Sequence, residues 1–453
     1  MHYIQPVTID LVRLHELNPD RYPYLLESVA HGTRHSRYDI LFAFPQQTLC
    51  LTADSILQAP AEWRGNGFLS ALEQWYLRDY QACLADKELP FHGGWFVYLA
   101  YELVREIEAD TDCTHAGNDE IIAYAARCPA AVIVDHQQDA LIYFAEDDRS
   151  DLLALLKNDV ASLAATNEPD TKPGKLLDDM FEEVPDRYLQ AVRKIKNYIL
   201  EGDVFQVNLS RLWNIRLKPD IKATDLYRNL RINNPAPFAG LAVIDDITII
   251  SSSPERLVSV RDNVAETRPI AGTRPRSERL AEDRRLSDEL MAHPKEQAEH
   301  IMLIDLERND LGRVCVPGSI MVDELMSLES YTHVHHIVSN VRGELRADVN
   351  PVDVIRAVFP GGTITGCPKV RCMQIIAELE QQPRGAYTGS MGYINLDGSM
   401  DLNILIRTLL KSANEISLRA GAGIVHDSDP ENELNETRAK ARGLLRSLWL
   451  EDI

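Results

Sequence analysis

The sequence predicts an α+β protein in which mainly antiparallel sheets are packed inside and helices lie outside. Two observations predict this class. Short β-type runs recur through both halves of the chain, and they outnumber regular strand–helix–strand units. The 453 residues are enough to bury a large core and leave room for one to three domains, and 45% hydrophobic with 26% charged residues is ordinary for a globular protein.

The N-terminal half consists of β-type runs and one helical segment. The runs are residues 40–44, 48–52, 95–101, 130–136 and 140–146, and the helical segment is near residues 67–85. Residues 165–187 are polar and acidic with three prolines, which is typical of a linker or a long surface excursion. We therefore divide the chain into an N-terminal part (1–164), this linker or excursion (165–185) and a C-terminal region (186–453).

The C-terminal region begins with an amphipathic helix at residues 188–202, whose apolar positions recur at helical spacing and which ends near Gly202. Strands are expected at residues 205–213, 240–244 and 248–253, followed by a helix around residues 280–311. The last third alternates strands at 389–396, 402–410 and 415–425 with helices around 368–380 and 431–449.

The overall composition excludes several classes of protein. The formal charge of −22 argues against nucleic acid or an anionic membrane as the main partner, but it allows a local basic pocket for an acidic metabolite. No apolar run approaches the ~20 residues that span a bilayer, and the first residues lack a signal-peptide core, so we expect a cytoplasmic protein. The seven cysteines are scattered, form no CxxC and lie in no Gly-x-Cys-x-Gly elbow, so a zinc site, a disulfide framework and a built-in cysteine amidotransferase are not expected.

The stretch ETRPIAGTRPR, residues 266–276, places two Arg-Pro pairs around a Gly-Thr. Proline and glycine predict a rigid loop, the arginines suit carboxylates, and Gly272 would let backbone N–H groups approach a ligand. A surface turn with solvated charges is the alternative. The nearby HVHH is not metal spacing for a helix, and it predicts a strand with His333 and His335 on one face and His336 on the other.

Two helical segments carry carboxylates at i, i+3 spacing, namely Glu296 with Glu299 and Glu433 with Glu436. Residues three apart share a helix face, so each pair can present its oxygens in one direction. Carboxylates without nearby Cys or His ligands suit a hard ion such as Mg²⁺, which accepts one or two protein carboxylates plus water and substrate oxygens. The alternative is a solvated helix face.

Three further segments suit anionic ligands. GGTITGCPK, residues 361–369, lacks the GK[ST] ending of a nucleotide loop and is expected to be a tight turn before a helix, whose N-terminus could still attract an anion. Gly421 and Gly423 end a strand where N–H groups could reach a carboxylate, or where strands simply pack closely. Arg407 is a lone cation in what we expect to be an apolar strand, so it must find an internal or ligand anion.

Taken together and in this order, the segments resemble the chorismate-utilising enzymes, and within them the synthase subunits of aminodeoxychorismate synthase and anthranilate synthase. The matching segments are GDVFQVNLSR, SSSPERL, RPIAGTRPR, KEQAEHIMLIDLERNDLGR, HHIVS, PGGTITGCPKVRCMQII, GAYTGSMGY, LIRT, AGAGIVHDS and NETRAKAR. They cover residues 186–449 nearly without a gap, so the resemblance is highly specific. LLES, SRYDI and FHGGWFVYLAYEL extend it into the N-terminal part.

The resemblance implies a fold, a metal ion and a set of site residues. The fold is one large α+β unit in which two sheets face each other with helices outside. The ion is Mg²⁺, for which Glu299 and Glu436 match the ligands and Glu296 and Glu433 match partners that act through water. Positions that match chorismate-binding residues are Gly272, Thr273, Tyr387, Arg407, Gly421, Ala422 and Gly423, and His336, Thr363 and Lys440 match further active-site positions.

The chemistry of the family explains these residues. Mg²⁺ on the ring carboxylate of chorismate would draw electron density from the diene, while Arg407 and Tyr387 would hold the enolpyruvyl carboxylate. Glu255, in SPER, matches the general acid that protonates the departing 4-hydroxyl.

Two positions discriminate within the family. Water-adding isochorismate and salicylate synthases carry a lysine base where this chain has Gln206, and a neutral amide cannot deprotonate water, so ammonia is the better nucleophile here. Many aminodeoxychorismate synthases carry a lysine at the position of Ala271, which attacks C2 of chorismate covalently, whereas anthranilate synthases carry alanine. Ala271 therefore favours anthranilate synthase, with direct attack of ammonia on C2.

Other segments favour the aminodeoxychorismate branch. The N-terminal half is short for an anthranilate synthase large subunit, and YPYLLESVAHGTRHSRYDILFAFP, AARCPAAVIVDHQ, FPGGTITG and DLNILIRT look more like the other branch. The balance favours a chorismate-aminating transferase, aminodeoxychorismate synthase component I, in a lysine-free form that makes the precursor of 4-aminobenzoate for folate. The alternatives are a lyase, anthranilate synthase component I of the tryptophan pathway, and a catalytically idle family member that binds an amino acid or a partner chain.

Two further expectations concern a partner and a second ligand. Because the chain has no glutaminase motif, ammonia is expected from a separate glutamine amidotransferase subunit. LLES with Ser28, and NPAPF with Pro235 and Phe238, resemble the tryptophan pocket of anthranilate synthases, although related pockets also occur in the other branch. Plain core packing at a strand end is the alternative for LLES.

Overall fold

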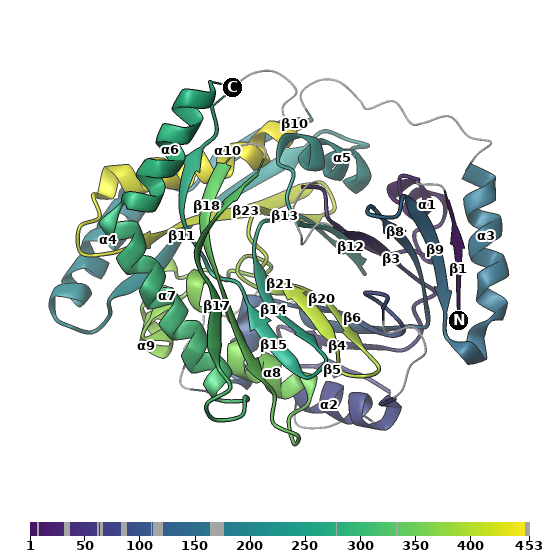
Figure 1. Ribbon diagram of the computed structural model, residues 1–453. Helices are drawn as coiled ribbons and strands as arrows, with labels where there is room; N and C mark the ends of the chain where they lie inside the picture. The colour runs from purple at the N-terminus through teal and green to yellow at the C-terminus, as the bar shows by residue number, and fades with distance from the viewer. Residues whose placement is uncertain are drawn as a thin grey trace.

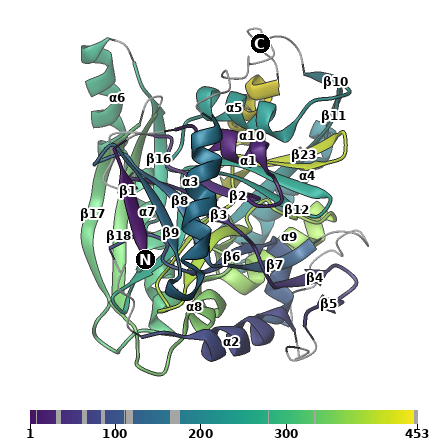
Figure 2. The same ribbon diagram turned by 90° about the vertical axis from the view of Figure 1, so that its right-hand side faces the viewer.

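In the computed structural model, two antiparallel sheets face each other and helices cover their outer faces (Figures 1 and 2). The structure describes residues 1–6, 9–30, 37–60, 63, 67–82, 88–109, 111, 121–163, 176–277, 279–331 and 334–448. Within these residues sheet A has twelve strands and sheet B eleven, paired antiparallel throughout. The predicted α+β class is confirmed.

Each sheet combines a block of strands from the N-terminal half with a block from the C-terminal half, so neither half forms a sheet alone. Sheet A runs β1 (His2–Gln5), β9 (Ala140–Ala145), β8 (Ala130–Asp135), β3 (Tyr38–Ala43), β2 (Tyr24–Glu27), β12 (Phe238–Ile244), β13 (Ile247–Ser253), β22 (Thr408–Ser412), β23 (Glu415–Ile424), β11 (Gln206–Leu217) and β10 (Leu177–Glu182), with β19 (Gly366–Cys367) beside β11. Sheet B runs β16 (Ile270–Pro275), β18 (Val334–Glu344), β15 (Val264–Thr267), β14 (Arg256–Arg261), β21 (Met400–Asn403), β20 (Ser390–Asn395), β6 (Gly94–Leu99), β7 (Ile121–Cys128), β4 (Thr48–Thr52) and β5 (Leu57–Gln58), with β17 (Met321–Ser330) beside β18.

The helices lie on the outside of both sheets. They are α1 (Val12–Leu17), α2 (Phe68–Asp79), α3 (Asp151–Leu163), α4 (Pro185–Leu200), α5 (Ala223–Asn233), α6 (Leu280–Ala292), α7 (Pro294–Gly312), α8 (Pro351–Val358), α9 (Lys369–Glu380) and α10 (Pro430–Leu448), with 3₁₀ turns η2 (Tyr101–Glu106), η3 (Asp147–Arg149) and η4 (Gly362–Ile364). In Figure 1, α5 and α10 lie above sheet A, and α2 and α8 lie below sheet B. No helix in the described ranges combines the length and hydropathy that crossing a membrane requires.

Hydrophobic side chains form one layer between the sheets and one outside each sheet. In the middle layer, the rings of Tyr24 from sheet A and Phe96 from sheet B are stacked with their centroids 4.1 Å apart. Trp213 of β11 belongs to the outer layer of sheet A, and Trp95 of β6 to that of sheet B. Burying apolar area on both faces explains why so many strands are apolar without alternation.

Local sequence explains where the helices begin. α4 begins at Pro185, whose fixed φ and missing N–H suit the first turn, and its buried face includes Tyr188, Val192 and Ile195. α8 begins after Asn350, whose side-chain oxygen accepts hydrogen bonds from the first free N–H groups of the helix. The helices predicted near residues 188–202, 368–380 and 431–449 are confirmed.

Two predicted elements differ in the structure. The helix expected around residues 280–311 is two helices, α6 and α7, which meet at His293–Pro294, because proline disfavours the helical conformation in the residue before it. The strand expected at residues 402–410 is also divided, into β21 of sheet B and β22 of sheet A. Of the predicted linker, residues 177–182 form the edge strand β10, and residues 165–175 lie outside the described ranges.

Two of the places where the chain crosses between the sheets are neighbours. One crossing connects β13 to β14 through Pro254 and Glu255, and the other connects β21 to β22 through residues 404–407. The N–H of Ile404 donates a hydrogen bond of 3.0 Å to the carbonyl oxygen of Glu255, so the two crossings lie side by side. Glu255 and Arg407, which the sequence nominates for different roles, are thereby brought to the same region.

Candidate active site

Glu255 is a carboxylate enclosed by the protein at the first crossing. The residue is 6% exposed, and Oε1 has no hydrogen-bond partner among the described residues. Burial raises the pKa of Glu255 to about 7, whereas the neighbouring Thr363 hydroxyl and the charge of Lys440 act in the opposite direction. A carboxyl group with this pKa holds its proton in an appreciable fraction of molecules near neutrality, as a general acid requires.

Thr363 reaches Glu255 from the turn η4. The hydroxyl lies beside the carboxyl group without the geometry of a hydrogen bond, and Thr363 Oγ1 has no partner within the described ranges. η4 is held against α7, where Gly362 packs so closely on the side chain of Leu306 that a Cβ atom would collide with it. The segment 361–369 is therefore a tight turn before α9, as predicted.

The glycines of β23 leave an open surface of the site beside β11, the glycine floor. A Cβ atom at Gly421 would lie 2.6 Å from Tyr387 Oη and 2.8 Å from Asn208 Oδ1, and one at Gly423 would collide with the amide of Gln206. Oδ1 of Asn208 and Oε1 of Gln206 are buried acceptors without a hydrogen-bond partner among the residues described. These free acceptors suit a ligand that donates hydrogen bonds.

Ala422, between the two glycines, does not share this surface through its side chain. Its methyl group is fully buried in a hydrophobic cluster with Val207 and Ile375 on the opposite face of the strand. The alternation of side chains along a strand causes this difference, so only the backbone of Ala422 is available to a ligand on the glycine side.

Basic groups from α10 and the second crossing border the glycine floor. Lys440 Nζ donates to the Gly421 carbonyl at 3.1 Å and pairs with Glu436 Oε1 at 2.6 Å. The Arg407 guanidinium donates to the Lys440 carbonyl at 2.9 Å and forms no ion pair with any described carboxylate. Burial lowers the pKa of Arg407, while Tyr387 and Glu436 raise it. The site therefore contains a cation whose charge is not neutralised by a direct carboxylate partner.

Arg407 lies between strands rather than within one, contrary to the sequence prediction. Its φ of 54° is in the left-handed region, which directs the chain from sheet B to sheet A. The segment that we expected to be one strand is mostly apolar because its first half is buried in sheet B and its second half in sheet A. The predicted need for a ligand anion at Arg407 remains, since a backbone carbonyl is the only group that the guanidinium binds within the described ranges.

β16 and β18 place His336 near Arg407. Nδ1 of His336 lies 2.9 Å from Thr273 Oγ1 and 3.3 Å from the Gly272 carbonyl, and because a carbonyl only accepts, Nδ1 carries the proton. Burial lowers the pKa of His336 to about 4, opposed by the Gly272 carbonyl, and the charge of Arg407 lowers it further. His336 is therefore neutral near pH 7, with Nε2 unprotonated.

The stretch around Ala271 is a bulged edge strand rather than a free loop. Ala271 faces Ile337 of β18, Thr273 faces His336, and the register shifts at Gly272, whose φ is 62°. A Cβ atom at Gly272 would lie 2.9 Å from Glu296 Oε2, so the bulge rests against the start of α7. Of the other histidines, His335 is buried in β18, and His333 lies outside the described residues.

The predicted metal ligands fall into two places. Glu296 pairs with Arg274 at 3.3 Å, and Glu299 is half-buried one turn further along α7. On α10, Glu433 is buried and Glu436 is exposed. Burial is the first cause that raises the pKa of the Tyr188 hydroxyl, and the charges of both glutamates raise it further. Glu436 pairs with Lys440, which donates to the Gly421 carbonyl, so Glu436 lies near the glycine floor.

The carboxylate donors of these residues are of the type that Mg²⁺ accepts, and the magnesium site stays a prediction. No group of three or more His, Cys, Asp or Glu residues in the described ranges forms a protein-only metal cage. Mg²⁺ does not need one, because it takes one or two carboxylates together with water and substrate oxygens. Carboxylates that lack imidazole or thiolate partners suit Mg²⁺, and the charge of the nearby Arg407 suits an anionic substrate that would complete the coordination of the ion.

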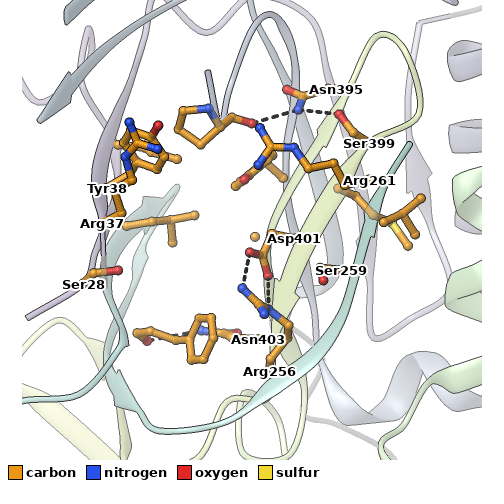
Figure 3. A pocket seen from close by; sticks show the side chains of 18 of the residues that line it. Ser28, Arg37, Tyr38, Arg256, Ser259, Arg261, Asn395, Ser399, Asp401 and Asn403 are labelled. Carbon is orange, nitrogen blue, oxygen red and sulfur yellow. Dashed lines mark hydrogen bonds and ion pairs between the residues drawn. The ribbon is translucent and has the colours of Figure 1, made fainter. Parts of the chain in front are cut away.

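A separate cavity lies between the two sheets (Figure 3). The cavity has a volume of about 440 Å³. Ser28 and Phe238 line it as predicted, but the proline that lines it is Pro237 and not Pro235. Arg256, the residue after Glu255, faces this cavity and forms two hydrogen bonds with Asp401, of 2.8 and 2.9 Å. LLES is thus more than core packing, and tryptophan as the ligand stays a prediction.

The sequence did not identify the ion-pair network that supports Tyr387. Buried Glu380 pairs with Arg384 at 2.7 Å and with Arg419 at 2.9 Å, and the Arg384 guanidinium lies 5.5 Å from the centroid of the Tyr387 ring. The two arginines lower the pKa of Glu380 against the effect of burial. A helix-end glutamate and two scattered arginines offer no sequence signal, because only the fold brings them together.

Comparison with known proteins points to one family and one fold. The family model described as chorismate binding enzyme matches residues 24–446. An anthranilate synthase component I-like protein of Synechocystis sp. is 44% identical over 365 residues, covering 80% of this chain and 74% of the relative. Aminodeoxychorismate synthase component 1 of Bacillus subtilis is 42% identical over 369 residues, with 80% and 78% covered. The solved structure of anthranilate synthase component I from Streptococcus pneumoniae has a TM-score of 0.80 at 30% identity, with 92% of this chain and 93% of that chain covered.

Proposed function

Because this chain belongs to the family of chorismate-binding enzymes, we propose that it is an aminodeoxychorismate synthase component I, which aminates chorismate to 4-amino-4-deoxychorismate. The observation that carries this proposal is the pairing of a buried, unpartnered acid with a cation that lacks a carboxylate partner among the described residues. Glu255 can donate a proton, and Arg407 can hold an anionic substrate beside it.

The reaction balances with the groups on this chain. Ammonia forms a C–N bond at C4 as the C4–O bond of chorismate breaks, and the hydroxyl leaves as water with the proton of Glu255. The ammonium group formed on the substrate loses one proton to solvent, and Glu255 takes one proton from solvent, so the acid and the charge balance are restored. Arg407 and Tyr387 bind the enolpyruvyl carboxylate, and Lys440 contributes positive charge next to Glu255. Bound Mg²⁺, held by Glu299 and Glu436, would supply charge compensation for the ring carboxylate.

The polar groups of β11 favour ammonia over water as the nucleophile. Gln206 is a neutral amide and cannot act as a base toward water, whereas ammonia needs no deprotonation before it attacks. The unpartnered oxygens of Gln206 and Asn208 can accept hydrogen bonds from an N–H nucleophile. We propose that a separate glutamine amidotransferase subunit supplies this ammonia in the cell.

One observation favours a second candidate, anthranilate synthase component I. Ala271 has no amine for a covalent adduct, so ammonia must attack the ring directly, as in that reaction. The relatives at 44% and 42% identity carry names from both branches, so identity does not separate them. We prefer the aminodeoxychorismate branch because of the short N-terminal half and the segments FPGGTITG and DLNILIRT. An idle family member is disfavoured by the costly buried groups kept in the site.

Product analysis separates the two candidates. The purified chain should consume chorismate with ammonium and Mg²⁺ at alkaline pH, where free ammonia is available. Chromatography after addition of an aminodeoxychorismate lyase should show 4-aminobenzoate. Fluorescent anthranilate as the main product would reject the preferred branch, and unchanged chorismate under all conditions would reject both.

A lysine introduced at Ala271 tests the proposed ring attack. The Ala271→Lys variant is expected to form a covalent adduct with chorismate, because its amine would stand where many aminodeoxychorismate synthases carry a lysine, on the edge strand two residues before Thr273. Intact-protein mass spectrometry should show the added mass after incubation with chorismate and Mg²⁺. Ala271→Met is the matched control for side-chain volume and should show no added mass. An unmodified lysine variant that still turns over chorismate would contradict the assignment of this position.

A further inference from the structure

Arg384 is a buried arginine that has no role in the reaction described so far. It lies in the connection between α9 and β20, and it is 4% exposed. Its guanidinium has five N–H groups, and each of them donates a hydrogen bond within the protein. Two of these bonds go to Glu380, at 2.7 and 3.0 Å. The other three go to acceptors elsewhere in the fold, so Arg384 does more than neutralise one glutamate.

The three other acceptors belong to segments that carry site residues. Nη1 of Arg384 donates to the Ile364 carbonyl of η4 at 3.1 Å. Nη2 donates to the Asn208 carbonyl at 2.7 Å, in the part of β11 that borders the glycine floor. Nη1 also donates to Thr388 Oγ1 at 3.3 Å, directly after Tyr387. One guanidinium therefore joins η4, β11 and the connection that carries Tyr387.

The backbone of Arg384 holds the same connection. The N–H of Tyr387 donates to the Arg384 carbonyl at 3.1 Å, so residues 384–387 form a turn. The N–H groups of Arg384 and Gly385 donate to the two carboxylate oxygens of Glu102, at 2.7 and 3.0 Å. The turn that ends at Tyr387 is thus anchored through Arg384 to both halves of the chain.

The ring of Tyr387 lies between Arg384 and the glycine floor. The central carbon of the guanidinium is 5.5 Å from the centroid of the ring. The hydroxyl lies over Gly421, where an added Cβ atom would be only 2.6 Å from it. The place of this hydroxyl on the floor therefore depends on where Arg384 holds the turn.

The same connection is joined to the crossing that carries Arg407. Directly after Tyr387, the N–H of Thr388 donates to the Leu405 carbonyl at 2.8 Å. Main-chain hydrogen bonding thus sets Arg407 next to the connection, while Arg384 sets Tyr387 within it. Both groups are proposed above to hold one carboxylate, so their relative position matters for binding.

We propose that Arg384 is a positioning residue, which holds the Tyr387 hydroxyl where it binds the enolpyruvyl carboxylate of chorismate. This inference rests on the proposed function for the identity of the ligand. A lysine in place of Arg384 would keep the positive charge beside Glu380. It has only three donors on one nitrogen, so it cannot reach the acceptors in η4, β11 and the Tyr387 connection together.

A double-mutant cycle on chorismate binding tests the proposal. Calorimetric titration with Mg²⁺ and without ammonium gives Kd for wild type, Arg384→Lys, Tyr387→Phe and the double variant. Arg384→Lys should weaken binding about tenfold in the wild-type background, as expected for the loss of one hydrogen bond to a carboxylate. In the Tyr387→Phe background the same substitution should weaken binding less than about twofold, because the hydroxyl to be positioned is already absent.

The matched control is Arg228→Lys. Arg228 is also a buried arginine, 7% exposed, and it holds Glu16 with two hydrogen bonds of 2.7 Å where α5 meets α1. This variant should bind chorismate as wild type does. An equal loss from Arg384→Lys in both backgrounds would indicate a general effect on the fold and overturn the proposal, and so would wild-type affinity in Arg384→Lys.

A second substitution serves if Arg384→Lys does not fold. Thr388→Val removes one acceptor of the guanidinium and leaves the ion pair with Glu380 intact. It should weaken binding about threefold in the wild-type background and leave it unchanged in Tyr387→Phe. Equal effects in the two backgrounds, or none in either, would again overturn the role of Arg384.

The cycle separates this inference from the proposed function, because it measures binding and not the product. Anthranilate as the product would reject the preferred branch and leave the result of the cycle valid. Absence of coupling in a wild type that binds and aminates chorismate would overturn the role of Arg384 alone. A wild type that does not bind chorismate would overturn both.

Discussion

The Glu255→Gln variant is expected to convert chorismate roughly 10²–10⁴-fold more slowly than wild type, because glutamine cannot give a proton to the departing hydroxyl. The loss should appear in kcat, since the carboxyl group acts on the leaving group rather than on the substrate carboxylates. Steady-state rates at saturating chorismate and ammonium, with Mg²⁺ present, measure it. Thermal unfolding should show a folded protein, because an amide fits the same buried space.

The pH dependence has a definite sign. Because burial raises the pKa of Glu255 to about 7, the acid is protonated below that pH and loses its proton as the pH rises. Wild-type kcat per free ammonia should therefore fall toward alkaline pH, and this limb should be absent from Glu255→Gln. Glu415→Gln, at an exposed end of β23, is the matched control and should behave as wild type. Full activity of Glu255→Gln would remove this residue from the chemistry.

The Glu436→Gln variant is expected to lose turnover almost completely while remaining folded. Glu436 is about half exposed and pairs with Lys440, and exposed pairs contribute only about 0–1 kcal/mol to stability, so unfolding should be little affected. The proposed Mg²⁺ ion would lose one of two carboxylates that hold it. Rates measured against Mg²⁺ concentration should show no recovery at concentrations that saturate wild type.

The second arm of this test uses the metal itself. A chelator should abolish wild-type turnover, and added Mg²⁺ should restore it. Glu431→Gln removes an exposed acid from the first turn of the same helix and should retain the wild-type response. Wild-type rates in Glu436→Gln would take Glu436 out of the metal site.

Local patterns predicted most helices and strands, because capping residues, prolines and apolar periodicity act within a few residues. They failed where long-range packing decides the structure. Residues 402–410 are mostly apolar, since each half is buried in a different sheet, and a continuous strand has the same pattern. The order of strands was also beyond local signals, because β2 pairs with β12 from the other half of the chain.

The site residues show the same difference between what local patterns predict and what long-range packing decides. The resemblance to a family nominated Glu255, Arg407 and Lys440, and the structure places them together. The ion-pair network of Glu380, Arg384 and Arg419 was missed because Arg419 is far from the other two in the sequence and only the fold brings it to them.

The adjacent crossings between the sheets have a further consequence for how this site can change. The proton donor and the anion-binding guanidinium are carried by short connections joined by a backbone hydrogen bond, from Ile404 to Glu255. One sheet cannot slide over the other without separating the two groups. The distance between the two groups is therefore set by the main chain. Substitutions of the surrounding side chains can change which nucleophile or which acidic substrate the site accepts without changing that distance.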